Sequence, residues 1–188
     1  MGWTGLTLPA GKTRKAYLDE ALVLTAGNFG QCVLASAMVG TTYYAAVERI
    51  FTDGQPREVP AAVILTRGGD RSWSTNFTYK DMDEGMGPVE CACPLAILKL
   101  LTPTETRYAN DWRARVRAFH EREAALKRDV RPGARLRFAE PIEFRSGVKR
   151  QTLRLLSGST FEDERGSRFS VTGWRSSEFT ILPAGAPW

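Results

Sequence analysis

The segment Trp73-Ser-Thr-Asn-Phe-Thr-Tyr-Lys-Asp81 has the strict alternation of a half-buried β-strand. Its odd-numbered positions hold the three aromatic residues, whereas Ser, Asn, Thr and Lys occupy the even-numbered positions. Because successive side chains of a strand point to opposite faces of the sheet, we expect the aromatic face to meet a hydrophobic core. The strand would then place Asp81 at the edge of a hydrophobic layer.

The chain before this segment contains three further stretches rich in Val, Ile, Thr and Tyr, a composition typical of strands. Turn residues, Gly40 and the segment 53–56, separate them. We therefore expect an antiparallel meander that the segment 73–81 continues. The three earlier strands are predicted at residues 32–39, 42–51 and 61–66.

Helices are expected on both sides of this meander in the sequence. A first helix is predicted over 14–24, with Thr13 as its N-cap. A short helix over 95–101 is predicted because Pro94 suits the first helical position. The segment Thr102-Pro-Thr-Glu105 matches a capping box with proline at N1, which predicts a longer helix that runs to about residue 128.

The long helix carries one apolar stripe, formed at helical spacing by Tyr108, Trp112, Val116 and Phe119. Helical periodicity of this kind usually reports burial, so we expect the stripe to dock on the sheet.

The segment after Arg131-Pro-Gly133 is rich in short predicted strands, at 135–138, 142–144, 152–156, 168–171 and 178–182. They predict a small curled sheet or a five-stranded barrel. The fold class is therefore α+β: an antiparallel sheet with helices on one face, followed by a small β-rich, barrel-like subdomain. The expected domains are 1–130 and 131–188. Residues 183–188 are expected to be a loose tail, although a Trp such as Trp188 can anchor in a surface groove.

The formal charge of +5 is unevenly distributed along the chain. Residues 105–155 hold 14 Lys and Arg against 7 Asp and Glu, a net charge of +7, and the rest of the chain has 12 against 14, or −2. A basic surface attracts phosphate backbones or an acidic protein patch. The residues expected to form it are Arg113, Arg117, Arg122, Lys127, Arg128, Lys149 and Arg150.

The alternative is a solvated helix with weak ion pairs to interspersed acidic residues. The sequence shows no helix-turn-helix, zinc-finger or RNA-binding sheet signature. If nucleic acid is bound, we therefore expect contacts to phosphates rather than reading of bases.

Residues 77–94 form an unusually polar loop, whose notable members are Lys80, Asp81, Asp83, Glu84 and Cys93. The three carboxylates could hold Mg²⁺ or Mn²⁺, which prefer carboxylate oxygens. Alternatively, they cap backbone donors and pair with basic residues, and Lys80 could neutralise them. The second interpretation is favoured, and neither a metal nor another cofactor is predicted.

Cys93 precedes Pro94 at a predicted helix N-cap, where the helix dipole would favour a thiolate. A cysteine nucleophile needs a base, however, and the one histidine, His120, lies in a charged helix with no visible partner. A buried or capping cysteine is therefore favoured, and no catalytic residue is predicted. Three cysteines and one histidine also argue against a disulfide framework and a zinc site.

The longest apolar runs, 89–101 and 61–66, are shorter than the roughly 20 residues that a membrane-spanning helix needs. The first residues also lack the basic and apolar segments of a secretory signal. A cytoplasmic protein without membrane contact is the expectation.

Several strings within residues 1–117 carry a resemblance to a known family. They are Met1-Gly-Trp-Thr4, the Ser-Ala-Met-Val-Gly-x-x-Tyr-Tyr-Ala-Ala-Val stretch at 36–47, Tyr-Lys-Asp-Met-Asp-Glu at 79–84, Gly87-Pro88, Cys-Pro-x-x-Ile-Leu-x-Leu-Leu-Thr-Pro-Thr at 93–104 and Tyr-Ala-Asn-x-Trp-Arg at 108–113. In these strings the chain resembles an uncharacterised family of proteins encoded on phages, plasmids and integrative elements. The resemblance implies an accessory role in mobile-element biology, such as blocking a host defence or supporting DNA transfer.

The basic segment and the resemblance together lead to a functional hypothesis. We expect a non-enzymatic protein that binds a nucleic acid or a nucleic-acid-bound host protein complex and inhibits a host defence, in the manner of an anti-CRISPR or anti-restriction protein. One alternative is a metal-dependent enzyme that acts on nucleic acid or nucleotides through Asp81, Asp83 and Glu84. Another is a protein-protein interaction module that uses the β-rich end. The sequence does not predict the oligomeric state.

Overall fold

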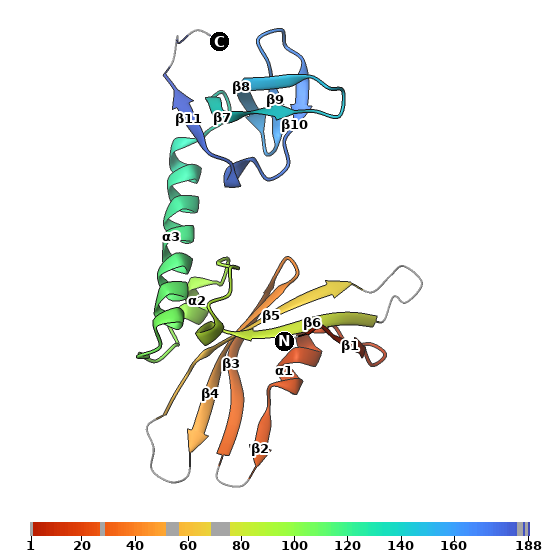
Figure 1. Cartoon of the computed structure of the whole chain (residues 1–188), viewed down its shortest axis with the longest axis vertical. Helices are drawn as coiled ribbons and strands as arrows, with labels where there is room; N and C mark the ends of the chain where they lie inside the picture. Colours follow the sequence, from red (N-terminus) through yellow and green to blue (C-terminus); the bar gives the residue numbers. More distant parts are fainter. Residues whose placement is uncertain (1, 27–28, 52–56, 69–75, 184–185, 187) are drawn as a thin grey trace. The chain divides into compact units, whose positions relative to one another are not determined.

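The computed structural model describes residues 2–26, 29–51, 57–68, 76–183, 186 and 188. The chain forms two compact units, Met1–Glu121 and Arg122–Trp188, and each contains an antiparallel sheet (Figure 1). The predicted α+β class is confirmed. The sequence placed the boundary between domains at residue 130, after the long helix, whereas the structure divides the chain within that helix. No helix in the described parts of the chain has the length and apolar character needed to cross a membrane.

The first unit is built on a six-stranded sheet with the order β1-β6-β5-β4-β3-β2. Its strands are β1 (Thr4–Thr7), β2 (Leu24–Ala26), β3 (Phe29–Val39), β4 (Thr42–Phe51), β5 (Ala61–Gly68) and β6 (Asn76–Asp83). β3 to β6 are the predicted meander, and Phe77 of β6 is buried as the alternation requires. The predicted residues 73–75 of this strand lie outside the described residues.

The central strand β4 is buried on both faces of the sheet. Tyr43 and Ala45 pack in a core with Leu18 of the first helix, whereas Tyr44 and Ala46 pack with α2 (Leu95–Leu98) and α3 (Arg107–Asp129). The expectation of helices on one face is therefore wrong. A strand that is buried on both faces has a continuous apolar run instead of an alternating one, and Tyr43 to Val47 is such a run.

The first helix, α1 (Arg14–Ala21), begins as predicted. Thr13 is its N-cap, and its hydroxyl accepts a hydrogen bond from the backbone N–H of Ala16 at 3.2 Å. The helix ends at the C-cap Leu22 and not at residue 24, because Leu24 already pairs with Gln31 in the sheet.

The predicted capping box at Thr102 is wrong, because α3 begins at Arg107. Thr102 bonds to the distant residue Val59 instead. Its N–H donates to the carbonyl of Val59 at 3.1 Å, and its hydroxyl accepts from the N–H of Val59 at 2.9 Å. These two bonds tie the segment before α3 to the segment before β5.

The buried face of α3 is only partly the predicted stripe. Trp112 and Val116 are fully buried, but Tyr108 is 65% exposed and Phe119 is 37% exposed, so their predicted docking is wrong. The buried residues of the helix are Ala109, Trp112, Arg113 and Val116. The buried face of α3 thus includes an arginine, Arg113, and a pattern of apolar residues alone does not predict its burial.

The second unit contains a five-stranded sheet with the order β10-β9-β8-β7-β11. Its elements are β7 (Arg135–Glu143), β8 (Lys149–Ser157), β9 (Thr160–Glu162), β10 (Arg168–Ser170), the short helix η2 (Trp174–Ser176) and β11 (Phe179–Leu182). The two strands predicted at 135–138 and 142–144 are one strand with an irregularity, and β9 was not predicted. The sheet curls around a core that includes Leu136, Phe138, Leu153, Phe161 and Trp174.

Candidate functional site

The polar loop turns sharply at the end of β6. Asp83 is the N-cap of η1 (Glu84–Met86), and its Oδ1 accepts a hydrogen bond from the N–H of Met86 at 3.1 Å. Gly87 ends this turn with a φ of 62°, in the left-handed region that favours glycine. The turn directs the side chain of Glu84 into the protein, where it is 4% exposed.

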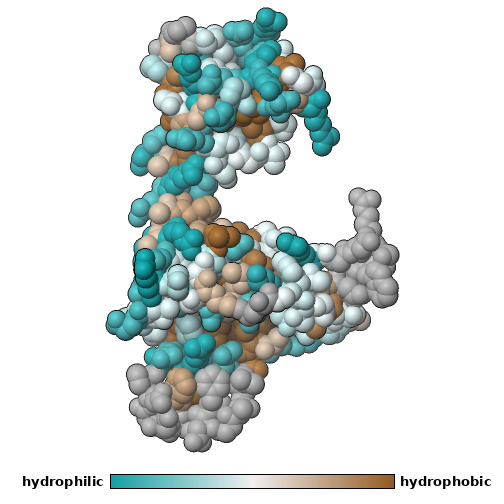
Figure 2. Space-filling view, in the orientation of Figure 1, coloured by the Kyte–Doolittle hydropathy of each residue, from teal (hydrophilic) through white to brown (hydrophobic). Residues whose placement is uncertain are grey.

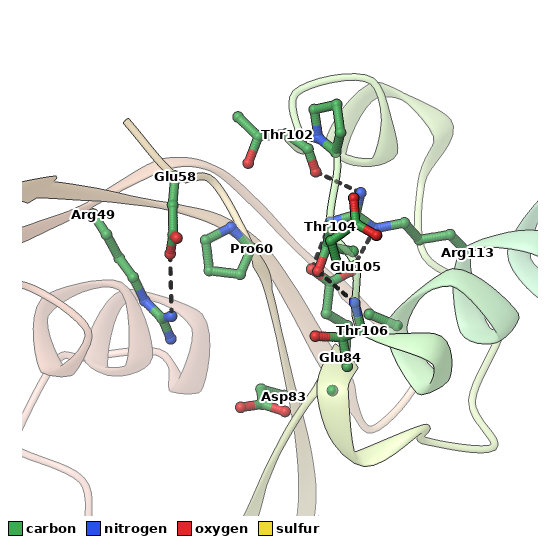
Figure 3. Close-up of a pocket in the computed structure, with 13 residues that line it drawn as sticks. Arg49, Glu58, Pro60, Asp83, Glu84, Thr102, Thr104, Glu105, Thr106 and Arg113 are labelled. Atoms are coloured by element: carbon green, nitrogen blue, oxygen red, sulfur yellow. Dashed lines mark hydrogen bonds and ion pairs between the residues drawn. The ribbon is translucent and has the colours of Figure 1, made fainter. Parts of the chain in front are cut away.

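Glu84 forms a buried ion pair with Arg113 of α3 (Figure 3). The Nε and Nη2 atoms of Arg113 donate to the two carboxylate oxygens at 2.7 and 2.6 Å, and Nη1 donates to the carbonyl oxygen of Thr102 at 2.6 Å. The prediction that Arg113 belongs to a basic surface is wrong, because its side chain is buried and three of its nitrogens have partners. Glu84, Thr102 and Arg113 form a clasp that joins the polar loop to α3.

A pocket of about 470 Å³ lies beside this clasp. Figure 3 shows the Arg49–Glu58 pair on one side, Thr102 to Thr106 with Arg113 on the other, and Asp83 between them. Three carboxylates of the wall have partners within the protein. Oε2 of Glu58 lies 3.9 Å from Nη1 of Arg49, Glu84 forms the ion pair with Arg113, and Asp83 caps η1. These contacts favour a structural role for the polar loop.

The alternative metal site loses one of its three proposed ligands, because both oxygens of Glu84 bind Arg113. Asp81 and Asp83 remain together at the surface, where partial loss of hydration and then the charge of Asp83 raise the pKa of Asp81. Lys80 alternates to the opposite face of β6 and forms no ion pair with them among the described residues. The described ranges contain no cluster of three or more His, Cys, Asp or Glu side chains suited to a metal ion.

Cys93 is not placed as a nucleophile. It is fully buried, the N-cap of α2 is Pro94, and burial with the nearby charge of Glu84 raises the pKa of the thiol to about 12. His120 Nε2 lies 2.8 Å from the carbonyl oxygen of Cys93, to which it donates a hydrogen bond. The predicted N-cap role of Cys93 is wrong, whereas its predicted burial is confirmed.

The other predicted basic residues are divided between the two units. Arg117 is exposed on the first unit, and the second unit carries Arg122, Lys127, Arg128, Lys149 and Arg150. Several are already engaged: Arg122 donates to the carbonyls of Arg175 and Ser177, and ion pairs join Arg128 to Asp129, Lys149 to Glu143 and Arg150 to Asp163. Within the described chain, Arg117 and Lys127 have no side-chain partner.

The structure gathers a different set of arginines on the outer face of the second sheet. Strand pairing places Arg168, Glu162, Arg154 and Arg135 in one row across β10, β9, β8 and β7. Their neighbours in sequence, such as Leu136 and Phe161, point into the core, so the row faces outward. We call this surface the basic face; it comprises Arg135, Arg137, Arg150, Arg154 and Arg168.

The basic face keeps a positive charge after its internal pairs are considered. Glu162 pairs with Arg154 and Asp163 pairs with Arg150, but Arg137 and Arg168 have no acidic partner in the described structure. Figure 2 shows strongly hydrophilic side chains over much of the visible surface of this unit. Trp188 lies at the basic face, with its ring centroid 5.5 Å from the guanidinium carbon of Arg135 and 5.9 Å from that of Arg154.

Asp163 supports one end of the basic face from below the surface. Its side chain is 1% exposed, and Oδ2 accepts from Nε of Arg150 at 2.8 Å. Oδ1 accepts from the N–H groups of Arg165 and Ser167 at 3.0 and 2.9 Å. Burial alone would raise the pKa of Asp163, but these hydrogen bonds outweigh it and hold the pKa below its ordinary value of 3.8.

Asp163→Asn is expected to lower the free energy of unfolding of the second unit by roughly 1–3 kcal/mol, because charge-assisted bonds to a buried group are lost. A carboxyl group whose pKa is lower in the folded than in the unfolded protein stabilises the fold at pH values above its unfolded-state pKa. This stabilisation is lost as the pH falls through the folded-state pKa. The wild-type protein should therefore lose stability below about pH 4, and the variant should lose less over the same range. Urea unfolding at a series of pH values measures both effects. Parallel pH profiles for the two proteins would contradict the prediction.

Comparisons with known proteins show a similarity for part of the chain. Residues 103–180, less than half of the chain, match the family model described as Domain of unknown function (DUF6927). No curated protein and no solved structure matches the chain. The matched residues span all of α3 and the sheet of the second unit except the end of β11, so the similarity includes the basic face. The phage or plasmid origin expected from the resemblance stays a prediction.

The sequence contained a signal for the basic face that charge counting did not use. Arg135-Leu-Arg-Phe138 and Arg154 between Leu153 and Leu155 alternate charged with apolar residues, as strands with one solvated face do. Strand register, which brings Arg168 into the same row, depends on pairing between distant segments.

Proposed function

We propose that the second unit binds nucleic acid through the phosphate backbone, and that the basic face is the contact surface. The observation that carries this proposal is the row of outward arginines, since guanidinium groups suit phosphate oxygens in both charge and geometry. The sequence supports it: residues 122–188 hold 13 Lys and Arg against 8 Asp and Glu, a net charge of +5, whereas residues 1–121 hold 13 of each.

The proposal assigns no catalytic step to the chain. Cys93 is buried and Glu84 is held by Arg113, so these two residues serve packing in this structure, whereas Asp81 and Asp83 are exposed. The resemblance leads us to expect inhibition of a host defence. Such inhibition would operate through the same binding of a nucleic acid or a nucleoprotein complex.

Salt dependence tests the proposal. In a titration of the full chain with labelled DNA at increasing salt, each phosphate contact contributes about −0.9 to the slope of log K against log salt for a duplex and about −0.7 for a single strand. Three or more contacts from the basic face predict a slope steeper than about −2. Absence of binding at low salt, or an affinity that barely changes with salt, would overturn the proposal and favour a protein partner.

A further inference from the structure

We infer that the basic face prefers single-stranded nucleic acid, with one unpaired base held against the indole ring of Trp188. This inference rests on the proposed function and specifies its ligand. Two observations carry it: an indole ring that lies close to two guanidinium groups, and a pocket that this ring borders.

Trp188 has the surroundings of a base-stacking side chain. Its ring lies within cation–π distance of Arg135 and Arg154, and the residue is still 43% exposed. An aromatic ring beside backbone-binding cations is the combination with which proteins hold single strands, because every base offers a π-face.

The pocket beside Trp188 has a volume of about 360 Å³. This volume lies at the small end of the range for ligand sites, which suits one base and its sugar and not a helix of two strands. In a duplex the bases are stacked and paired, so a base can enter such a pocket only when it is unpaired.

The wall of the pocket supplies the other groups that a nucleotide requires. Lys149, Arg150 and Arg165 lie on the wall and carry positive charge that suits phosphates, although Lys149 also pairs with Glu143 and Arg150 with Asp163. Gln151 and Thr152 are of the residue types that hydrogen-bond to base edges. The wall carries three cationic side chains, Lys149, Arg150 and Arg165, against the two carboxylates of Asp163 and Glu164, so its net charge is +1.

The test compares three labelled DNA probes that carry the same number of phosphates per strand: a mixed-sequence single strand, its duplex and an abasic single strand. Fluorescence anisotropy of the full chain should show the tightest binding to the intact single strand. Trp188→Ala should weaken that binding about 5- to 150-fold and should change binding to the abasic strand by less than about 2-fold. Trp188→Phe, which keeps an aromatic face, should retain most of the affinity.

The abasic strand separates stacking from a structural role of the ring. If Trp188→Ala weakens binding to the intact and abasic strands equally, Trp188 only positions Arg135 and Arg154, and the inference is overturned while the proposed function stands. Equal or tighter binding of the duplex by the wild-type protein also overturns it. If none of the three probes binds at low salt, the proposed function fails as well.

Discussion

Glu84→Ala is expected to lower the free energy of unfolding of the first unit by about 3–5 kcal/mol, because it leaves the buried guanidinium of Arg113 without its counter-charge. Arg113→Ala should cost a similar amount, since it strands the carboxylate of Glu84 and also removes the donor to the carbonyl of Thr102. Urea unfolding followed by circular dichroism measures both losses.

Arg117→Ala is the matched control, because Arg117 lies one turn further along the same helix but is exposed and unpaired among the described residues. It should change the free energy of unfolding by less than about 0.5 kcal/mol. The double variant Glu84→Leu, Arg113→Met removes both charges together, and it should cost less than the sum of the two alanine variants, since the desolvation penalty disappears with the pair. If the free energy of unfolding of each single alanine variant, Glu84→Ala or Arg113→Ala, lay within about 1 kcal/mol of the wild-type value, the burial of this ion pair would be contradicted.

This ion pair also changes how charge-reversal experiments on the helix are interpreted. Arg113→Glu would place two carboxylates together in a buried site, so the expected result is loss of the folded first unit. A binding defect in that variant would therefore report unfolding. Only arginines that reach the surface and have no buried counter-charge can test contact with a partner.

The parts of the fold that the sequence predicted are those that depend on local chemistry. The alternation in β6 and the Thr13 cap of α1 each follow from residues that are close in sequence. The predicted short helix after Pro94 is also present, but it ends at Leu98 and not at residue 101, and Pro94 is its N-cap and not its first helical residue. The capping box at Thr102 failed for the opposite reason. Its hydroxyl satisfies the N–H of Val59, which is 43 residues away, and a local motif cannot anticipate a competing long-range bond.

The candidate site was harder to predict, because charge along the sequence does not report exposure. Arg113 and Arg117 look equivalent in the sequence, yet one closes a buried clasp and the other is exposed on the surface. Conversely, Arg135 and Arg168 are 33 positions apart, and they come into one row only through the pairings of β7, β8, β9 and β10. The sequence could indicate that the surface is positively charged, but the register of the sheet determined which arginines form it.

Removal of three charges from the basic face should have the largest effect on binding. The variant Arg135→Gln, Arg137→Gln, Arg168→Gln is expected to weaken DNA binding at low salt by at least about 100-fold, because each charged donor contributes about 1 kcal/mol or more to a phosphate contact. Arg154 is left intact, since it neutralises Glu162 within the sheet. The slope of log K against log salt should become shallower by about 2 to 3 units, as three fewer counterions are released.

The control variant removes the same number of charges from exposed residues of the first unit, Lys99→Gln, Arg107→Gln and Arg117→Gln. If binding depended only on the net charge of the chain, the two triple variants would weaken it equally and change the salt slope equally. If the basic face is the contact surface, the control should lose less than about 5-fold through the weaker long-range field, and its salt slope should match that of the wild type. Equal losses in the two variants would therefore show that the arginine row is not the contact, even if nucleic acid is bound.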